Sequence, residues 1–162
     1  MRFRTLTLEE LSALEAEFKH FLIVNHLYKE EWENLNKTNP AKAQEVVDLF
    51  SDTVLEKVYN KIHFLELRLP YSYSIYHIEE ESANTIQIQS PNQQFSLATN
   101  EEIEDALNHH YRELEIYFGN KKHEKTKADF VFELIEKGCH LSSETVWHAF
   151  SSFIGQGKKP TH

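Results

Sequence analysis

The first helix is predicted from Thr7 to about Asn25. Thr7 is followed three residues later by Glu10, which is the spacing of a capping box at a helix start. Behind it, apolar side chains recur every three or four residues and define one buried stripe. The stripe consists of Leu11, Leu14, Phe18, Phe21 and Leu22. A short polar helix is predicted over residues 29–36.

A second apolar stripe predicts one long helix over residues 40–69. Asn39 is placed to cap it, Pro40 suits the first helical position, and Pro70 ends the pattern. A helix of this length extends about 45 Å at 1.5 Å per residue. It either forms a spine inside the domain or projects to meet a partner, and its near-heptad spacing favours self-association. The stripe contains Val47, Phe50, Val54, Val58, Ile62, Leu65 and Leu69.

The apolar period changes to two after Pro70. Alternating apolar and polar residues predict strands over residues 71–78, 85–89 and 95–97, with turn residues between them. Together these strands predict a small three-stranded antiparallel meander.

Three further helices are predicted after the strands. They cover residues 99–119, 125–137 and 143–155. Gly119 and Gly138 stand where the first two end, and glycine favours the left-handed conformation that closes many helices.

A chain of 162 residues, 40% of them hydrophobic, is long enough to bury one core. The sequence therefore predicts a single α+β domain over residues 1–154, mainly helical, with the long helix at its centre. The meander is expected between the N-terminal and C-terminal helices. Residues 155–162 lack an apolar anchor and are predicted to be a disordered tail.

Charge and composition narrow the range of partners. Acidic residues outnumber basic ones 26 to 17, and a net charge of −9 disfavours binding to nucleic acid. The single cysteine excludes an internal disulfide and suits a reducing compartment. The acidic N-terminal region lacks a secretion signal or a membrane-spanning segment, which predicts a cytoplasmic protein.

A metal site is one hypothesis for the histidine-rich stretch DALNHHYRELE. Asp105, His109 and Glu113 are spaced four residues apart and therefore lie on one face of the predicted helix, over about two turns. Together they could bind a divalent cation. The alternative is a solvated helix face, because a metal needs three or four converging ligands and one helix face supplies two. His-Glu-x-x-His and Cys-x-x-Cys are absent. The sequence predicts no catalytic residue and no cofactor.

The strands carry a candidate interaction surface. Tyr71, Tyr73, Tyr76, Gln87 and Gln89 are amphipathic and uncharged, as is common at protein interfaces. The alternative is that the tyrosines close the core against the long helix. An unpaired edge of the sheet would also accept a strand from a partner.

Three segments resemble a family of small proteins of unknown function from Bacteroidota. They are RFRTLT at residues 2–7, LFSD and EKV at residues 49–58, and FELIEKGC at residues 132–139. The resemblance implies a cytoplasmic bacterial protein and brings no activity and no catalytic residues.

These observations favour a non-enzymatic interaction or regulatory module that binds another protein or itself through the long helix and the Tyr/Gln surface. The alternative is a divalent-metal-binding protein or a metal-dependent hydrolase. A third hypothesis, an RNA-associated factor, is disfavoured by the acidic charge.

Overall fold

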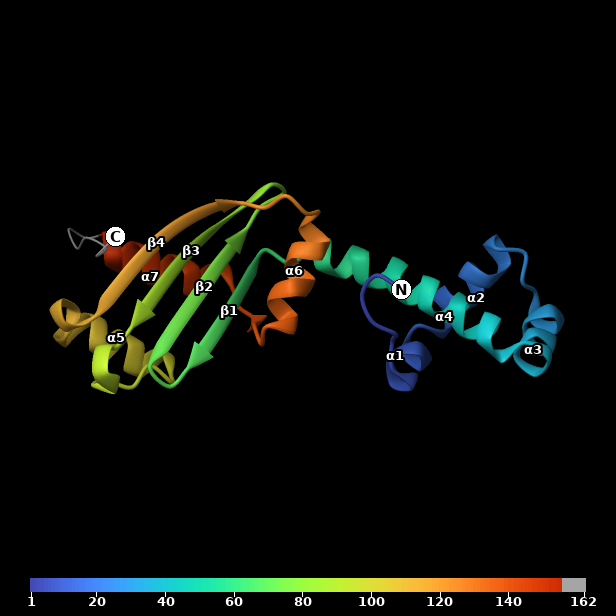
Figure 1. The fold of residues 1–162 in the computed structure, drawn as a ribbon, viewed down its shortest axis with the longest axis horizontal. Helices are drawn as coiled ribbons and strands as arrows, with labels where there is room; N and C mark the ends of the chain where they lie inside the picture. Colours follow the sequence, from blue (N-terminus) through green and yellow to red (C-terminus); the bar gives the residue numbers. More distant parts are fainter. Residues whose placement is uncertain (156–162) are drawn as a thin grey trace. The chain divides into compact units, whose positions relative to one another are not determined.

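The computed structural model describes residues 1–155, which form an α+β protein (Figure 1). The chain divides into two compact units, Met1–Val58 and Tyr59–His162. The described residues form seven α-helices and one five-stranded antiparallel sheet. The prediction of one domain over residues 1–154 stays a prediction. Of the tail predicted at residues 155–162, only Gly155 lies within the described residues, at the end of the last helix.

The first unit is helical. Its elements are α1 (Leu8–Ala13), α2 (Glu15–Val24), α3 (Lys29–Thr38) and most of α4 (Pro40–Asn60). The single helix predicted up to Asn25 is therefore two helices, which separate at Leu14. Aromatic rings pack between the helices, with Phe50 4.9 Å from Phe18 and 5.3 Å from Phe21 between centroids.

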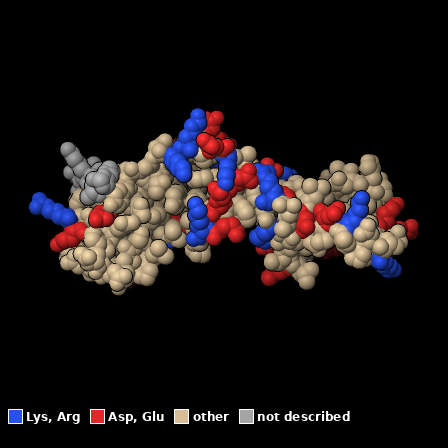
Figure 2. Space-filling view, in the orientation of Figure 1, with Lys and Arg blue, Asp and Glu red and all other residues tan. Residues whose placement is uncertain are grey.

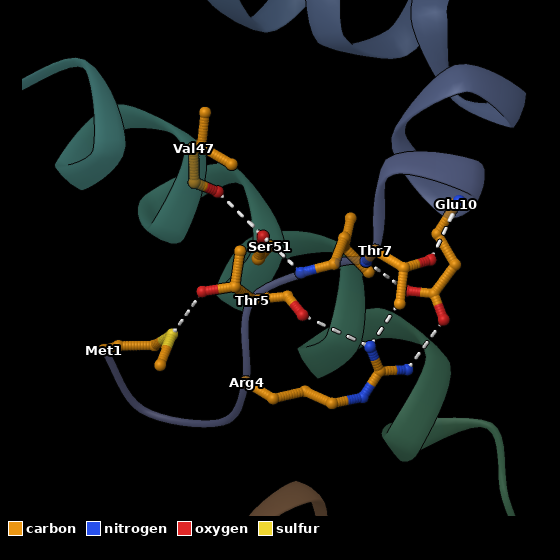
Figure 3. A network of polar contacts seen from close by, with 8 residues as sticks. Met1, Arg4, Thr5, Thr7, Glu10, Val47 and Ser51 are labelled. Atoms are coloured by element: carbon orange, nitrogen blue, oxygen red, sulfur yellow. Dashed lines mark hydrogen bonds and ion pairs between the residues drawn. The ribbon is translucent and has the colours of Figure 1, made fainter. Parts of the chain in front are cut away.

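The N-terminal segment is bonded to α4 and to the start of α1 (Figure 3). The Leu6 backbone N–H donates to the Ser51 hydroxyl at 3.0 Å, and that hydroxyl donates to the Val47 carbonyl at 2.8 Å. The capping box is confirmed, because the Thr7 hydroxyl and the Glu10 carboxylate each accept the other's backbone N–H. Arg4 then clamps the same carboxylate with two bonds of 2.9 and 3.0 Å.

The Arg4 clamp predicts acid sensitivity of this segment. The bond from Arg4, helped by the Thr7 N–H, holds the pKa of Glu10 below its ordinary value of 4.5. A depressed carboxyl pKa stabilises the fold above the unfolded value, and this contribution is lost as pH falls through the folded value. Glu10→Gln keeps the capping bond and removes the charge. We expect faster hydrogen exchange at residues 2–13 in E10Q than in the wild type at pH 7, and equal rates near pH 3. A difference that persists at pH 3 would contradict the clamp.

The prediction of one long helix over residues 40–69 is wrong. Pro40 begins α4 as expected, and the Asn39 side chain accepts from the Lys42 N–H at 3.2 Å, but the helix ends at Asn60 after 21 residues. Residues Phe64–Leu69 form strand β1 instead. In this stretch the leucines alternate with Glu66 and Arg68, so the period is also two, and pairing with the next strand decides the conformation.

The second unit contains a five-stranded sheet in the order β4-β3-β2-β1-β5, so the predicted three-stranded meander is wrong. Every neighbouring pair is antiparallel. The two strands predicted over residues 71–78 and 85–89 exist, whereas residues 95–97 are not a strand. Besides β1, the strands are β2 (Ser72–Ile78), β3 (Ser82–Gln89), β4 (Glu115–Lys122) and β5 (His140–Leu141).

Strand β4 replaces the second half of the helix predicted over residues 99–119. Helix α5 (Asn100–His109) ends ten residues early and is followed by a short 3-10 turn, η2 (Tyr111–Glu113). From Leu114 onward the apolar residues alternate with period two, which fits an edge strand beside β3. The helical spacing of Ile103, Leu107 and His110 does not continue beyond the turn.

Helix α6 (Lys127–Glu136) ends as predicted at Gly138. This glycine has a φ of 103°, its N–H donates to Ile135, and the Cys139 N–H donates to Leu134. These are the two bonds of a Schellman motif. The following residues pair with β1 as β5, and α7 (Glu144–Gly155) completes the described chain.

The main core of the second unit lies between one face of the sheet and helices α5 and α7. Helix α7 passes behind the sheet in the view of Figure 1. The sheet, the helices and the loops all contribute buried side chains to this core. They include Tyr73, Ile75, Ile86, Ile88, Leu97, Ile103, Leu107, Ile116, Phe150 and Ile154.

Candidate interaction surface

The sheet face opposite α7 carries small and uncharged polar side chains in register. Across the central strands Ser74 pairs with Gln87, and Gln87 pairs with Tyr117. Because side chains of directly paired residues point to the same face, these rows form one surface. We define the open sheet face as Ser72, Thr85, Gln87, Gln89, Tyr117 and Gly119, which are partly or fully exposed, whereas Ser74 in the same rows is buried.

This face is almost free of charge. Figure 2, in the same orientation as Figure 1, shows few Lys, Arg, Asp or Glu atoms over the middle of the sheet, and charged atoms at its ends. Glu115 lies at the margin, where its carboxylate accepts the Tyr117 hydroxyl at 3.0 Å and raises the pKa of that hydroxyl. The open sheet face therefore offers hydrogen-bond donors and acceptors without a strong field of either sign.

The structure brings together three of the five residues predicted to interact. Gln87 and Gln89 belong to the open sheet face, and both are partly exposed. Tyr76 is on the same face but half-buried, and its pKa is raised first by burial and then by the nearby Cys139 thiol. Tyr71 is 37% exposed in the turn before β2. Tyr73 points to the opposite face and is fully buried.

Tyr73 belongs to a polar cluster that sequence analysis missed. Its hydroxyl donates to Glu66 Oε2 at 2.5 Å, and the Ser142 hydroxyl donates to the same oxygen at 3.2 Å. Arg68 lies 4.8 Å from the Tyr73 ring centroid and donates to Glu66 at 3.3 Å and to Asn100 at 2.6 Å. Burial and the Glu66 carboxylate raise the pKa of Tyr73.

This cluster links elements that are distant in the sequence. Glu66 and Arg68 come from β1, Asn100 from the start of α5, and Ser142 from the segment between β5 and α7. Only the alternation of Glu66 and Arg68 with leucines signalled that the charges share a strand face. The geometry indicates a positioning role for the cluster, in which buried charges hold both helices on the sheet.

The structure separates the residues of the predicted metal site. Asp105 and His109 are adjacent on α5, with 3.7 Å between carboxylate and imidazole. Glu113 is in η2, beyond the helix end, and its carboxylate lies 3.8 Å from the His110 ring nitrogen. Among residues 1–155, no three His, Cys, Asp or Glu side chains are arranged to hold a metal ion.

The first unit carries a second feature, an apolar groove between α2 and α4. Its volume is about 690 Å³. Phe21 and Phe50 line it together with Val54 and Val58, two members of the stripe that sequence analysis assigned to the long helix. Val58 is 46% exposed, so this part of the stripe is not fully packed within its own unit.

The chain combines an α+β fold with an uncharged sheet surface, and it belongs to the DUF6495 family, a family of unknown function that matches residues 1–155. The resemblance of the three sequence segments to a family of unknown function is thereby confirmed, whereas an origin in Bacteroidota stays a prediction. Neither the curated proteins nor the solved structures include a significant match. No helix within residues 1–155 has both the length and the apolar character needed to cross a membrane.

Proposed function

We propose that this protein is a cytoplasmic, non-enzymatic interaction module that binds a protein partner on the open sheet face. The observation that carries the proposal is that the side chains of the open sheet face on β2, β3 and β4 are exposed or half-exposed and uncharged. Serine, threonine, glutamine and tyrosine side chains hydrogen-bond to backbone and polar groups without the desolvation cost of an ion. The proposal is for a partner with an uncharged polar and aromatic surface.

The charge distribution favours a protein partner over a nucleic acid. Binding to a phosphate backbone depends on Lys and Arg, and the open sheet face contains neither. The most prominent polar cluster, around Glu66 and Arg68, is on the covered face and is engaged in bonds within the chain. These features support binding rather than chemistry at this surface.

Site-specific photo-crosslinking tests the proposal. A photoreactive residue at Gln89, installed in the full chain in its native cells, is expected to yield one discrete adduct with another protein. The same probe at Glu144, an exposed position on α7, is the matched control and is expected to yield no such adduct. Gln87→Lys places a charge on the open sheet face. A bound partner would bury this charge unpaired, which is costly, so the yield of the Gln89 adduct is expected to fall at least tenfold. The melting temperature of the single chain is expected to stay unchanged, because the lysine reaches solvent when no partner is bound.

Two outcomes would contradict the proposal. The first is an adduct of equal yield from both probe positions. The second is an adduct that contains nucleic acid, or one that Gln87→Lys strengthens.

A further inference from the structure

Two histidine rings contact the segment at the start of helix α6. His123 precedes the helix and is 8% exposed. His63 lies between α4 and β1, and its ring contacts Lys127, the first residue of α6. The partners of the two rings differ in kind, so the rings need different protonation states to keep their bonds.

Both nitrogens of the His123 ring face carbonyl oxygens. Nδ1 lies 2.8 Å from the Lys125 carbonyl oxygen, and Nε2 lies 3.2 Å from the Glu79 carbonyl oxygen. A carbonyl only accepts hydrogen bonds, and a neutral imidazole carries one N–H, so the neutral ring can donate to only one of these two oxygens. The charged ring donates to both. In that state it ties the turn between β2 and β3 to the segment before α6.

The His63 ring has the opposite requirement. Its Nδ1 lies 2.9 Å from the Lys127 amine. The Lys127 side chain is only 1% exposed, and the His63 ring is its one hydrogen-bond partner among the contacts of residues 1–155. A lysine ammonium only donates, so the ring accepts this bond only while Nδ1 carries no proton. A charged His63 ring would lose the bond and place a second cation beside a buried one.

The other charged groups around the two rings lie at or near the surface. Glu80 approaches the Lys127 amine to 3.9 Å, but its side chain is 82% exposed, so solvent screens the attraction. Lys125 is bonded to Glu133 on α6. The remaining charges of the neighbouring segments are the exposed Lys61, Glu79, Glu81, Lys121, Lys122 and Glu124, and the half-buried Asp129 on α6. The direct bonds of the two rings therefore outweigh this screened field.

The segment held by these bonds borders the open sheet face. Helix α6 ends against this side of the sheet, since a Cβ on Gly138 would lie 3.7 Å from the Leu67 side chain. Leu67 pairs with Ser74, which is in the same row as Gln87. At the other end of the helix, the Phe130 ring stacks on the His123 ring with 4.6 Å between centroids. A change at the start of α6 thus acts at one border of the open sheet face.

We propose that His63 and His123 form a pH-dependent clamp, which holds the start of α6 on the sheet only while His123 is charged and His63 is neutral. At lower pH, His63 gains a proton and releases Lys127. At higher pH, His123 loses a proton and releases one of its two carbonyls. The clamp is therefore closed within a window of pH, in the range of about 5 to 8 where histidines change charge. It does not depend on the proposed partner binding, because it forms within the single chain.

Hydrogen exchange of the purified full chain at a series of pH values, from about 5 to about 8, tests the proposal. The reporters are the amides after the first turn of α6, beginning with the Phe130 N–H, which donates to the Thr126 carbonyl at 3.0 Å. The protection of these amides, corrected for the intrinsic pH dependence of exchange, is expected to pass through a maximum. It is expected to fall roughly tenfold on each side, as for the loss of one hydrogen bond to a charged group.

Substitutions assign each fall to one ring. His63→Gln keeps an acceptor for Lys127 that never gains a proton, so the fall on the acid side is expected to disappear. Lys127→Met removes the buried ammonium and is expected to abolish the same fall. His123→Gln cannot change its charge and is expected to abolish the fall on the alkaline side. His109→Gln, at an exposed position on α5, is the matched control and is expected to keep both falls.

Protection that is constant or changes in only one direction across this range would overturn the proposal. So would a fall on the acid side that persists in both H63Q and K127M, or a fall on the alkaline side that H123Q retains. The loss of either fall in H109Q would also overturn it, because that ring does not contact α6 in the structure.

Discussion

Replacing Ile86 with alanine is expected to lower the free energy of unfolding of the second unit by about 3 kcal/mol. Ile86 is fully buried in the centre of β3, between Ile75 and Phe118 in the sheet and within the core formed with α5 and α7. Its removal leaves a cavity that neighbouring strands cannot fill, because a paired strand moves little. Urea unfolding followed by Trp147 fluorescence in a Trp32→Phe background measures the change, since Trp147 packs against this core.

Gln87 provides the matched control for Ile86. The two residues are adjacent in β3 but point to opposite faces of the sheet. Gln87→Ala is expected to change the free energy of unfolding by less than about 0.5 kcal/mol, as for other surface positions. Equal losses in I86A and Q87A would show that a second layer covers the open sheet face in solution, and would contradict the assignment of that face as a surface.

Replacing Arg68 with methionine is expected to lower the free energy of unfolding by about 3 kcal/mol, which is in the range for breaking a largely buried ion pair. The side chains of Arg68 and Glu66 are 24% and 18% exposed, and the arginine is the only cation that bonds to this carboxylate among the described contacts. Its loss leaves a half-buried carboxylate supported by hydroxyl groups alone. The measurement is the same urea titration of the full chain.

A double-mutant cycle separates the charge pair from simple packing. Glu66→Gln removes the charge and keeps the side-chain volume, so E66Q/R68M has no unpaired ion. We expect the double variant to be at least about 1 kcal/mol more stable than the sum of the two single losses predicts. Strict additivity would show that Arg68 acts through its contacts with the Tyr73 ring and Asn100 and not through Glu66.

Local signals in the sequence predicted helix ends better than they predicted the sheet. The capping box at Thr7, the proline at position 40 and the glycine at position 138 each act through groups within a few residues, and all three are confirmed. The sequence predicts helices where β1 and β4 form, because the apolar residues of both stretches fit a period of two as well as a period of 3.6. Pairing with β2 and β3 decides between them, and that pairing is not visible in a local pattern.

The candidate surface was predicted in part for the same reason. Gln87 and Gln89 alternate with buried isoleucines, so their shared face could be read directly. Tyr73 was placed on the surface because a tyrosine suits either side of a sheet, and only its bond to Glu66 and the cover from α7 settle its direction. The Glu66–Arg68 cluster depends on contacts across as many as 76 residues, and the local pattern indicates only that the two charges share a strand face.

The two-residue strand β5 has a consequence for synthesis of the chain. Glu66 acquires its outer neighbour, His140, only after the ribosome has added 74 further residues. Until then the leucine-rich strand β1 lacks both its pairing with β5 and the packing of α7. At ordinary translation rates the nascent chain therefore exposes an unpaired, aggregation-prone strand edge for several seconds. Truncation before residue 140 is therefore expected to yield fragments that aggregate.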